Sequence, residues 1–153
     1  MSSEHPGTEI GTDIGTEIGT DIAGGATVIG EIIDLDLPLA HRHTSTVRVV
    51  AASLAADVGF SVDDIDELRL GVDEVVSIMA DAEGSEASRI HLRFVLSEHT
   101  ITVTVTRSGV AETITRDHVD QLAVRILDAV VDRFEVSDGA FVVSKRATTV
   151  HVG

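Results

Sequence analysis

The most informative part of this chain is the stretch Glu67-Leu68-Arg69-Leu70-Gly71-Val72-Asp73-Glu74-Val75-Val76-Ser77-Ile78, because its apolar residues recur at helical spacing. Ser61, followed three residues later by Asp64, resembles a capping box with Asp in place of the usual Glu. The sequence therefore predicts a long helix from Ser61 to about Asp81. The residues of its expected buried stripe are Ile65, Leu68, Val72, Val75, Val76 and Met79.

Glu74 lies on the side of this predicted helix that faces away from the stripe. At 100° per residue, Glu74 falls about 180° from Ile65, and Leu70, Gly71 and Ile78 surround it. A carboxylate framed by two large apolar side chains is not an ordinary solvated face. We expect another element, a ligand or a partner to cover it. The alternative is a helix buried on both sides, with Glu74 reaching water at the rim.

The rest of the chain alternates between strand and helix patterns, each bounded by a turn or capping signal. We expect strands over 27–37, 90–96, 101–105, 133–136 and 141–152, and helices over about 44–58 and 117–131. The expected boundary signals are Pro38, a Thr44 or Ser45 cap, Gly59, the Ser97-Glu98-His99 turn, an Asp117 cap and the Asp138-Gly139 turn. This order predicts an α+β fold: a two-layer sandwich with one mixed or antiparallel sheet and helices on one face.

Residues 7–22 are four copies of one tetrad, Gly-Thr-Glu-Ile or Gly-Thr-Asp-Ile. A period of four suits neither a strand nor a sustained helix face, and the repeated Gly weakens both. We therefore expect a flexible acidic tail over 1–25 and a folded domain over 26–153. A docking tail and a calcium-binding repeat are the alternatives, although carboxylates without a fixed turn geometry are poor calcium ligands.

Composition narrows the class of protein. The chain has 153 residues, of which 43% are apolar, enough for one core, and its net charge is −15. It has no cysteine, no apolar run of the roughly 20 residues that span a bilayer, and no secretory pattern at its start. We therefore expect a cytoplasmic protein that binds neither a membrane nor nucleic acid, since phosphates would be repelled. A positively charged protein partner would be attracted.

Three pieces of the chain carry a family resemblance. They are Val47-Arg48-Val49-Val50-Ala51-Ala52-Ser53-Leu54, then Leu68-Arg69-Leu70-Gly71-Val72-Asp73-Glu74-Val75-Val76, and then the paired strands with the last helix and hairpin. In order and spacing, about residues 27–150 resemble the anti-sigma-factor serine kinases of the RsbW type, which belong to the histidine-kinase-like (Bergerat-fold) ATPases. The resemblance implies a dimer that binds a sigma factor and phosphorylates an anti-anti-sigma partner.

The same resemblance assigns roles to individual positions. Glu74 matches the general base of the family's Glu-x-x-x-Asn box, and Gly109 matches a glycine of its Asp-x-Gly-x-Gly box. Arg48 matches a first-helix Arg that faces protein partners. We place the partner-binding surface on Arg48, Leu70, Gly71 and Ile78.

Three nucleotide-binding elements depart from the family pattern. Ile78 replaces the Asn that would hold Mg²⁺, and an aliphatic side chain offers no oxygen ligand. Arg107 replaces the Asp that would accept a hydrogen bond from adenine, and Ala111 replaces the second Gly. The lid is reduced to Glu112–Arg116, and the helix start after it has no Gly-rich phosphate cradle.

These observations leave two hypotheses. The first is an anti-sigma factor that sequesters a sigma factor without ATP turnover, and that requires no cofactor or metal. The second is a protein serine kinase that uses ATP and Mg²⁺, with Glu74 as base. His41 and His43 have the spacing of metal ligands but no third ligand at helical distance, so we do not expect a metal site there.

Overall fold

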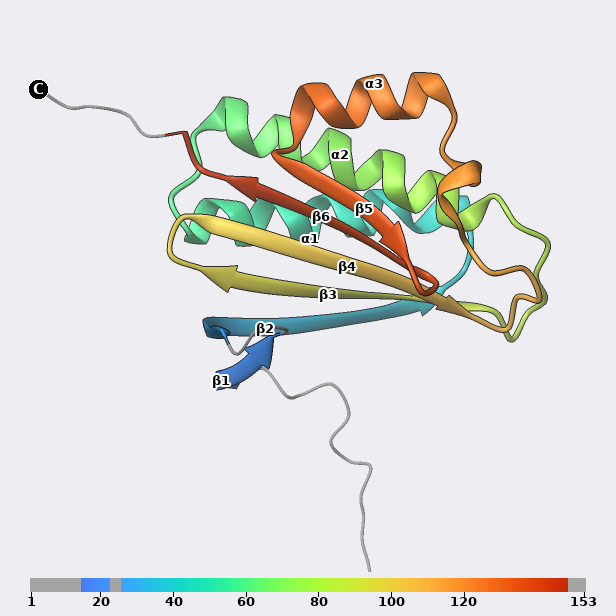
Figure 1. The fold of residues 1–153 in the computed structure, drawn as a ribbon, viewed down its shortest axis with the longest axis horizontal. Coiled ribbons are helices and arrows are strands. Elements are labelled where there is room, and N and C mark those ends of the chain that lie inside the picture. Colours follow the sequence, from blue (N-terminus) through green and yellow to red (C-terminus); the bar gives the residue numbers. More distant parts are fainter. Residues whose placement is uncertain (1–14, 23–25, 149–153) are drawn as a thin grey trace, which may run out of the picture.

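The computed structural model describes residues 15–22 and 26–148 (Figure 1). Its six strands form one sheet in the order β1-β2-β3-β4-β6-β5, and every neighbouring pair is antiparallel. The helices are α1 (Thr44–Asp57), α2 (Val62–Ala80) and α3 (Gln121–Val130), with short 3₁₀ turns η2 (His41–His43) and η3 (Arg116–His118). The strands are β1 (Gly15–Ile22), β2 (Ala26–Pro38), β3 (Arg89–Ser97), β4 (Thr100–Ser108), β5 (Arg133–Ser137) and β6 (Ala140–Arg146).

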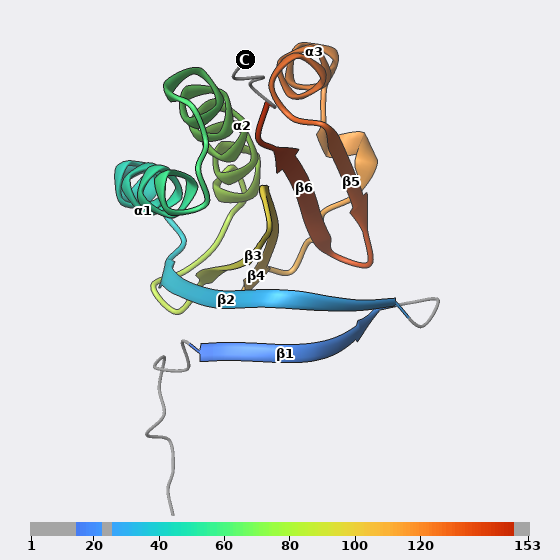
Figure 2. The ribbon, with the colours of Figure 1, turned by 90° about the vertical axis from the view of Figure 1, so that its left-hand side faces the viewer.

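The three helices lie on one face of the twisted sheet, so the predicted α+β two-layer fold is confirmed, with an antiparallel sheet (Figure 2). Side-chain alternation along the strands explains this arrangement. In β3, Leu92 and Phe94 are fully buried under the helices, whereas Arg93 between them is exposed on the opposite face. In β4, Ile101, Val103 and Val105 are buried in the same way.

Helix α2 lies at the centre of the helical layer and contacts α1, α3 and the sheet strands β4 and β6. The Ser61 hydroxyl accepts a hydrogen bond from the Asp64 amide at 3.1 Å, which confirms the predicted cap. The stripe predicted from the sequence faces the core, and Leu68, Val72 and Met79 are fully buried. Burying each such side chain stabilises the fold by roughly 1.5–3 kcal/mol.

The starts of the other two helices differ from the sequence-based expectation. Helix α1 continues from η2, and the Thr44 hydroxyl donates back to the His41 carbonyl at 2.7 Å instead of capping the helix. Helix α3 begins after Asp120, whose carboxylate accepts from the Ala123 amide at 2.8 Å. The expected cap, Asp117, lies within η3, because Thr115 and His118 close a separate 3₁₀ turn around it.

Both predicted hairpins are present. Ser97 pairs with Thr100 across Glu98 and His99, and His99 has a φ of 64°. Asp138 (φ 51°) and Gly139 (φ 77°) join β5 to β6 as a two-residue turn with both residues in the left-handed region. This geometry matches the right-handed twist of the flanking strands, which is why Asp-Gly is a strong hairpin signal.

The expected boundary between tail and domain is wrong for the last two repeats. Residues Gly15–Ile22 form β1, which pairs with β2 and extends the sheet beyond the helical layer (Figure 1). Strands are recognised in a sequence by alternating side chains, and a four-residue repeat has no such alternation. The backbone hydrogen bonds that hold β1 do not need it. Residues 1–14 and 23–25, the rest of the expected tail, lie outside the described residues.

A partly buried network of ion pairs and hydrogen bonds connects the residues at the end of the sheet to the start of α2. Asp64, 2% exposed, accepts from the Thr148 amide at 2.7 Å and from the Thr148 hydroxyl at 2.8 Å. The Lys145 ammonium lies 3.9 Å from Asp64 and donates to Glu67 at 2.8 Å. Burial opposes ionisation of Asp64, but the hydrogen bonds from Thr148 and Ser61 and the Lys145 charge outweigh it, so the pKa of Asp64 is lowered.

We predict that Asp64→Ala lowers the free energy of unfolding by about 2–4 kcal/mol, because it removes the acceptor of two Thr148 hydrogen bonds and leaves the buried Lys145 ammonium without one of its two carboxylates. Asp66→Ala, a change at an exposed neighbour in the same helix, should alter it by less than about 0.5 kcal/mol. Because the folded-state pKa of Asp64 is lowered, its contribution is present at neutral pH and is lost as the pH falls through that pKa. Urea unfolding at neutral and acidic pH measures both effects; equal losses for the two variants would contradict this role for Asp64.

Candidate functional site

Glu74 lies on the outer side of α2, half-buried, as its helical position predicts. Within the described residues, its carboxylate has no hydrogen-bond or ion-pair partner. Burial raises the pKa of Glu74, and the negative charges of Asp120 and Asp73 raise it further. The site therefore holds an unpaired carboxylate in a negative field, next to the start of α3.

The expected apolar frame around Glu74 is only partly present. Leu70 is 47% exposed, and Leu122 of α3 is 66% exposed. Ile78 is half-buried and packs against the core cluster. Other parts of the domain therefore cover this side of α2 at Gly71 and Ile78, as expected for a face that is not solvated. Leu70 remains exposed to solvent.

Gly71 does not belong to an open partner surface, contrary to the expectation. It is buried, and a Cβ atom added there would lie 2.7 Å from a methyl group of Val131 and 3.4 Å from one of Val130. The absence of a side chain lets the end of α3 approach α2 closely. Gly71 therefore serves helix packing inside the domain.

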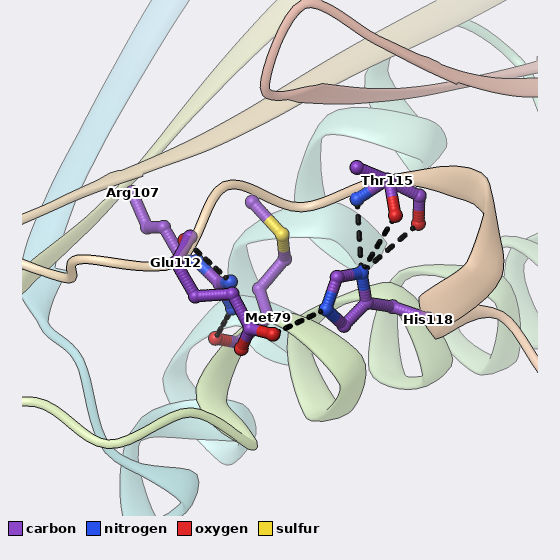
Figure 3. A network of polar contacts seen from close by, with 5 residues as sticks. All are labelled: Met79, Arg107, Glu112, Thr115 and His118. Atoms are coloured by element: carbon purple, nitrogen blue, oxygen red, sulfur yellow. Dashed lines mark hydrogen bonds and ion pairs between the residues drawn. The ribbon is translucent and has the colours of Figure 1, made fainter.

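Arg107, at the end of β4, occupies the place where the resemblance would put the adenine-binding Asp (Figure 3). Its guanidinium donates to the Met79 carbonyl at 2.7 Å and to the Glu112 carbonyl at 3.1 Å. Met79 lies in the last turn of α2, where unpaired carbonyls and the helix dipole favour a cation. Arg107 thus ties the strand, the helix end and the following loop together.

The loop after β4 is closed by a second set of contacts (Figure 3). The His118 ring lies 3.0 Å from the Glu112 carboxylate through Nε2, and its Nδ1 accepts from the Thr115 amide at 3.0 Å. The hydrogen bond with Glu112 raises the pKa of His118, and the same contact lowers the pKa of Glu112. The short segment that stands in place of a lid is therefore folded back on itself and on α2.

The backbone conformation explains why a glycine occupies position 109, without any ligand. Its φ is 74°, and an added Cβ would lie 2.9 Å from the Ser88 Cα atom. The Ser88 hydroxyl donates to the Gly109 carbonyl at 2.7 Å. The turn after β4 thus needs a glycine at this position, where it packs against the segment before β3, and the expected nucleotide-binding role of Gly109 has no independent support.

Arg48 connects the first two helices. Its guanidinium lies 3.7 Å from the Asp73 carboxylate, and both side chains are partly exposed. An ion pair of this length at the surface contributes little to stability, about 0–1 kcal/mol. Arg48 is therefore free to serve a contact with another molecule at small cost to the fold.

The charges and donors around Glu74 limit which ligands this site could bind. Arg107 offers donors to backbone carbonyls, and the charges that act on the Glu74 carboxyl are those of Asp120 and Asp73. This negative field opposes phosphate binding at the start of α3. Across residues 30–148, no group of three His, Asp or Glu side chains is placed to hold a metal ion, His41 and His43 included.

The sequence does not reveal that the Arg107 guanidinium binds the Met79 and Glu112 carbonyls. The cue was available, because Arg directly follows an alternating strand and precedes a Gly-containing turn. What the sequence lacked was the position of the Met79 carbonyl, which comes from an element 28 residues earlier.

Comparison with known proteins identifies a similar fold and nothing finer. No family model matches this chain. No curated protein matches it. Among solved structures, the RsbU and RsbW domains of Rv1364c from Mycobacterium tuberculosis superpose with a TM-score of 0.52 at 15% identity over 77% of this chain. The match covers 34% of the length of that chain, and at this identity it shows a similarity of fold alone.

We predict that Glu74→Gln raises the melting temperature at neutral pH. The charged carboxylate is disfavoured by burial and by two neighbouring negative charges, so its folded-state pKa lies above the unfolded one. Below both pKa values the wild-type carboxyl is neutral, and the difference between the two proteins should vanish. Melting curves between pH 4 and 8 measure this; Glu135→Gln, at an exposed position of β5, is the matched control. A variant less stable than wild type at neutral pH would contradict the unpaired state of Glu74.

Proposed function

We propose that this protein is an RsbW-like anti-sigma factor that regulates transcription by binding and sequestering a sigma factor, without ATP turnover. The proposal joins two supports: the sequence resemblance over the first two helices, and the likeness of the fold to a structure that contains an RsbW domain. Binding requires the helical scaffold, which is intact. Catalysis would require the nucleotide elements, which have been replaced.

The observation that carries the proposal is the position of Arg107. A guanidinium held by the Met79 and Glu112 carbonyls ties the post-β4 loop to α2, in the region where a nucleotide would have to enter. Ile78, which takes the place of the metal-binding Asn, packs against the core. Both replacements have acquired structural contacts, which is what a domain retained for binding would show.

The surface offers features suited to a protein partner. Exposed large apolar side chains are found on all three helices: Val49, Val62, Leu70 and Leu122. The net charge of −15 would accelerate association with a positively charged protein. We place the contact on α1 and α2, with Arg48 and Leu70 as its members. Gly71 and Ile78 are omitted because they serve the core.

The second candidate function is an ATP-dependent protein serine kinase acting on an anti-anti-sigma partner. One observation favours it: Glu74 is unpaired and has a raised pKa, as a general base requires. Under this alternative, ATP and Mg²⁺ would be needed, and Gly109 would take part in nucleotide binding.

Further expectations belong to the proposal and follow from the resemblance. They are a homodimer, a cytoplasmic location, and release of the sigma factor by an anti-anti-sigma partner. In the described part of the chain, none of the helices combines the length and the apolar character that crossing a membrane requires.

We predict that calorimetric titration with Mg²⁺-ATP at millimolar concentration shows no saturable binding. The base-reading Asp, the metal-binding Asn and the phosphate-cradling glycines are missing, and each lost partner costs roughly 1–3 kcal/mol. The double variant Arg107→Asp/Ile78→Asn, checked for folding, should also fail to bind, because the glycines are still absent. Saturable binding to the wild type, or transfer of phosphate to a partner serine that disappears in Glu74→Gln, would establish the kinase instead.

We predict that Arg48→Glu weakens sigma-factor binding by about tenfold or more, that is, by about 1.4 kcal/mol, while the melting temperature changes little. Because the new carboxylate would face Asp73, the variant is made alone and together with Asp73→Asn. Arg125→Glu, an equal charge change at an exposed position of α3, is the matched control. The measurement is a binding titration with the sigma factor that co-purifies from the native cell. Equal affinities for all four proteins would place the contact elsewhere.

A further inference from the structure

Strand β1 is one of two identical octapeptides. Residues 7–14 and residues 15–22 both read Gly-Thr-Glu-Ile-Gly-Thr-Asp-Ile. The structure places the second copy, Gly15–Ile22, along the free edge of β2. The sequence that the edge of β2 accepts is therefore present a second time, immediately upstream in the same chain.

The pairing of β1 with β2 contains a register shift at a residue type that the other copy also has at that position. Glu17 and Ile18 are opposite Gly30 and Ile29, and the register then shifts between Ile18 and Thr20. The residue at the shift is Gly19, the type of residue that a bulge accommodates most easily. Counting eight residues back from Gly19 gives Gly11, so the first copy carries its glycine at the same position.

We propose that the edge of β2 is a strand-docking site that accepts either octapeptide of its own chain. Moving the chain by eight residues replaces every residue of β1 by an identical residue, so the backbone pairing and the residue type at every position would be retained. A shift by an even number also keeps each side chain on its face of the sheet, whereas an odd shift would reverse the faces. A shift by four differs only in the exchange of Glu and Asp.

The two occupants differ mainly in the chain that connects them to β2. Three residues, 23–25, connect the second copy to β2; eleven residues, 15–25, would connect the first copy. The closure entropy of a flexible loop scales with the three-halves power of its length, so the second copy is favoured by about sevenfold. The first copy is thus a minor occupant, and it becomes the main one whenever the second is removed from the edge.

Hydrogen exchange of the β2 amides in the full-length chain tests the proposal. Thr16→Pro/Glu17→Pro disables the second copy: alternate residues of an antiparallel strand point their N–H groups at the partner, so two successive prolines remove at least one of these donors. Thr8→Pro/Glu9→Pro disables the first copy in the same way and is the matched control. The fourth protein carries all four prolines.

We expect the control to exchange like the wild type, and the second-copy variant to exchange no more than about tenfold faster over residues 26–33. The four-proline protein should lose the protection of the edge-facing amides altogether. The proposal is overturned if the second-copy variant loses protection as fully as the four-proline protein. It is also overturned if these amides are unprotected in the wild type, or if protection in the second-copy variant rises with protein concentration, since the strand would then come from another molecule.

Disulfide trapping identifies the occupant directly, because the chain has no cysteine of its own. Opposite Cα atoms in an antiparallel pair are about 4.5–5.5 Å apart, within the range of a disulfide. Ile18 is opposite Ile29 in the structure, so Ile10 would be opposite Ile29 when the first copy is docked. The pair Ile10→Cys/Ile29→Cys tests this register, and the pair Glu9→Cys/Ile29→Cys, which is one residue out of register, is its control. In the Thr16→Pro/Glu17→Pro background, the Ile10 pair should form at least tenfold more intrachain disulfide at redox equilibrium than the Glu9 pair. Equal amounts would show an undocked segment and overturn the proposal.

Discussion

The burial of the apolar stripe of α2 against the sheet is the interaction on which the rest of the structure depends. Leu68, Val72 and Met79 are fully enclosed, and α1 and α3 flank the same helix. Once this helix is fixed, its outer side holds Glu74 beside the start of α3, and its last carbonyls point toward the end of β4. Both halves of the candidate site therefore derive their geometry from one packed helix.

Arg107 shows how a single replacement acts twice. A carboxylate at this position would be repelled by the carbonyl oxygens at the end of α2, and would need a bound ligand to donate to it. A guanidinium satisfies the same carbonyls without a ligand, although its Nε atom stays buried without a partner among the described residues. Arg107 thus supplies a cross-link between the end of α2 and the loop after β4, so the loop keeps a defined path without a ligand.

The sequence predicted elements whose signals are local. The Ser61 cap, the stripe of α2 and the Asp138-Gly139 turn depend on residues within a few positions, and all three are present. Predictions failed where the role of a residue depends on an element that is distant in the sequence. Asp117 and Asp120 are equally good caps by composition, and the Thr115–His118 turn selects the second. Gly71 was placed on an open face because its neighbour, the end of α3, is about 60 residues away along the chain. The role of Arg107 and the pairing of β1 with β2 were missed for the same reason.

The network around Asp64 has a consequence for synthesis of the chain. Thr148, which supplies two of its hydrogen bonds, is made 84 residues after Asp64, and the Lys145 ammonium arrives only slightly earlier. Until then, the start of α2 contains a carboxylate that the folded core would have to bury unpaired. A nascent or prematurely terminated chain that ends before Lys145 therefore carries an electrostatic penalty at the centre of its helical layer. The contacts of Asp64 are therefore complete only after residues 145–148 have been made, and chains that end before them are recognisable to proteases by their incomplete packing.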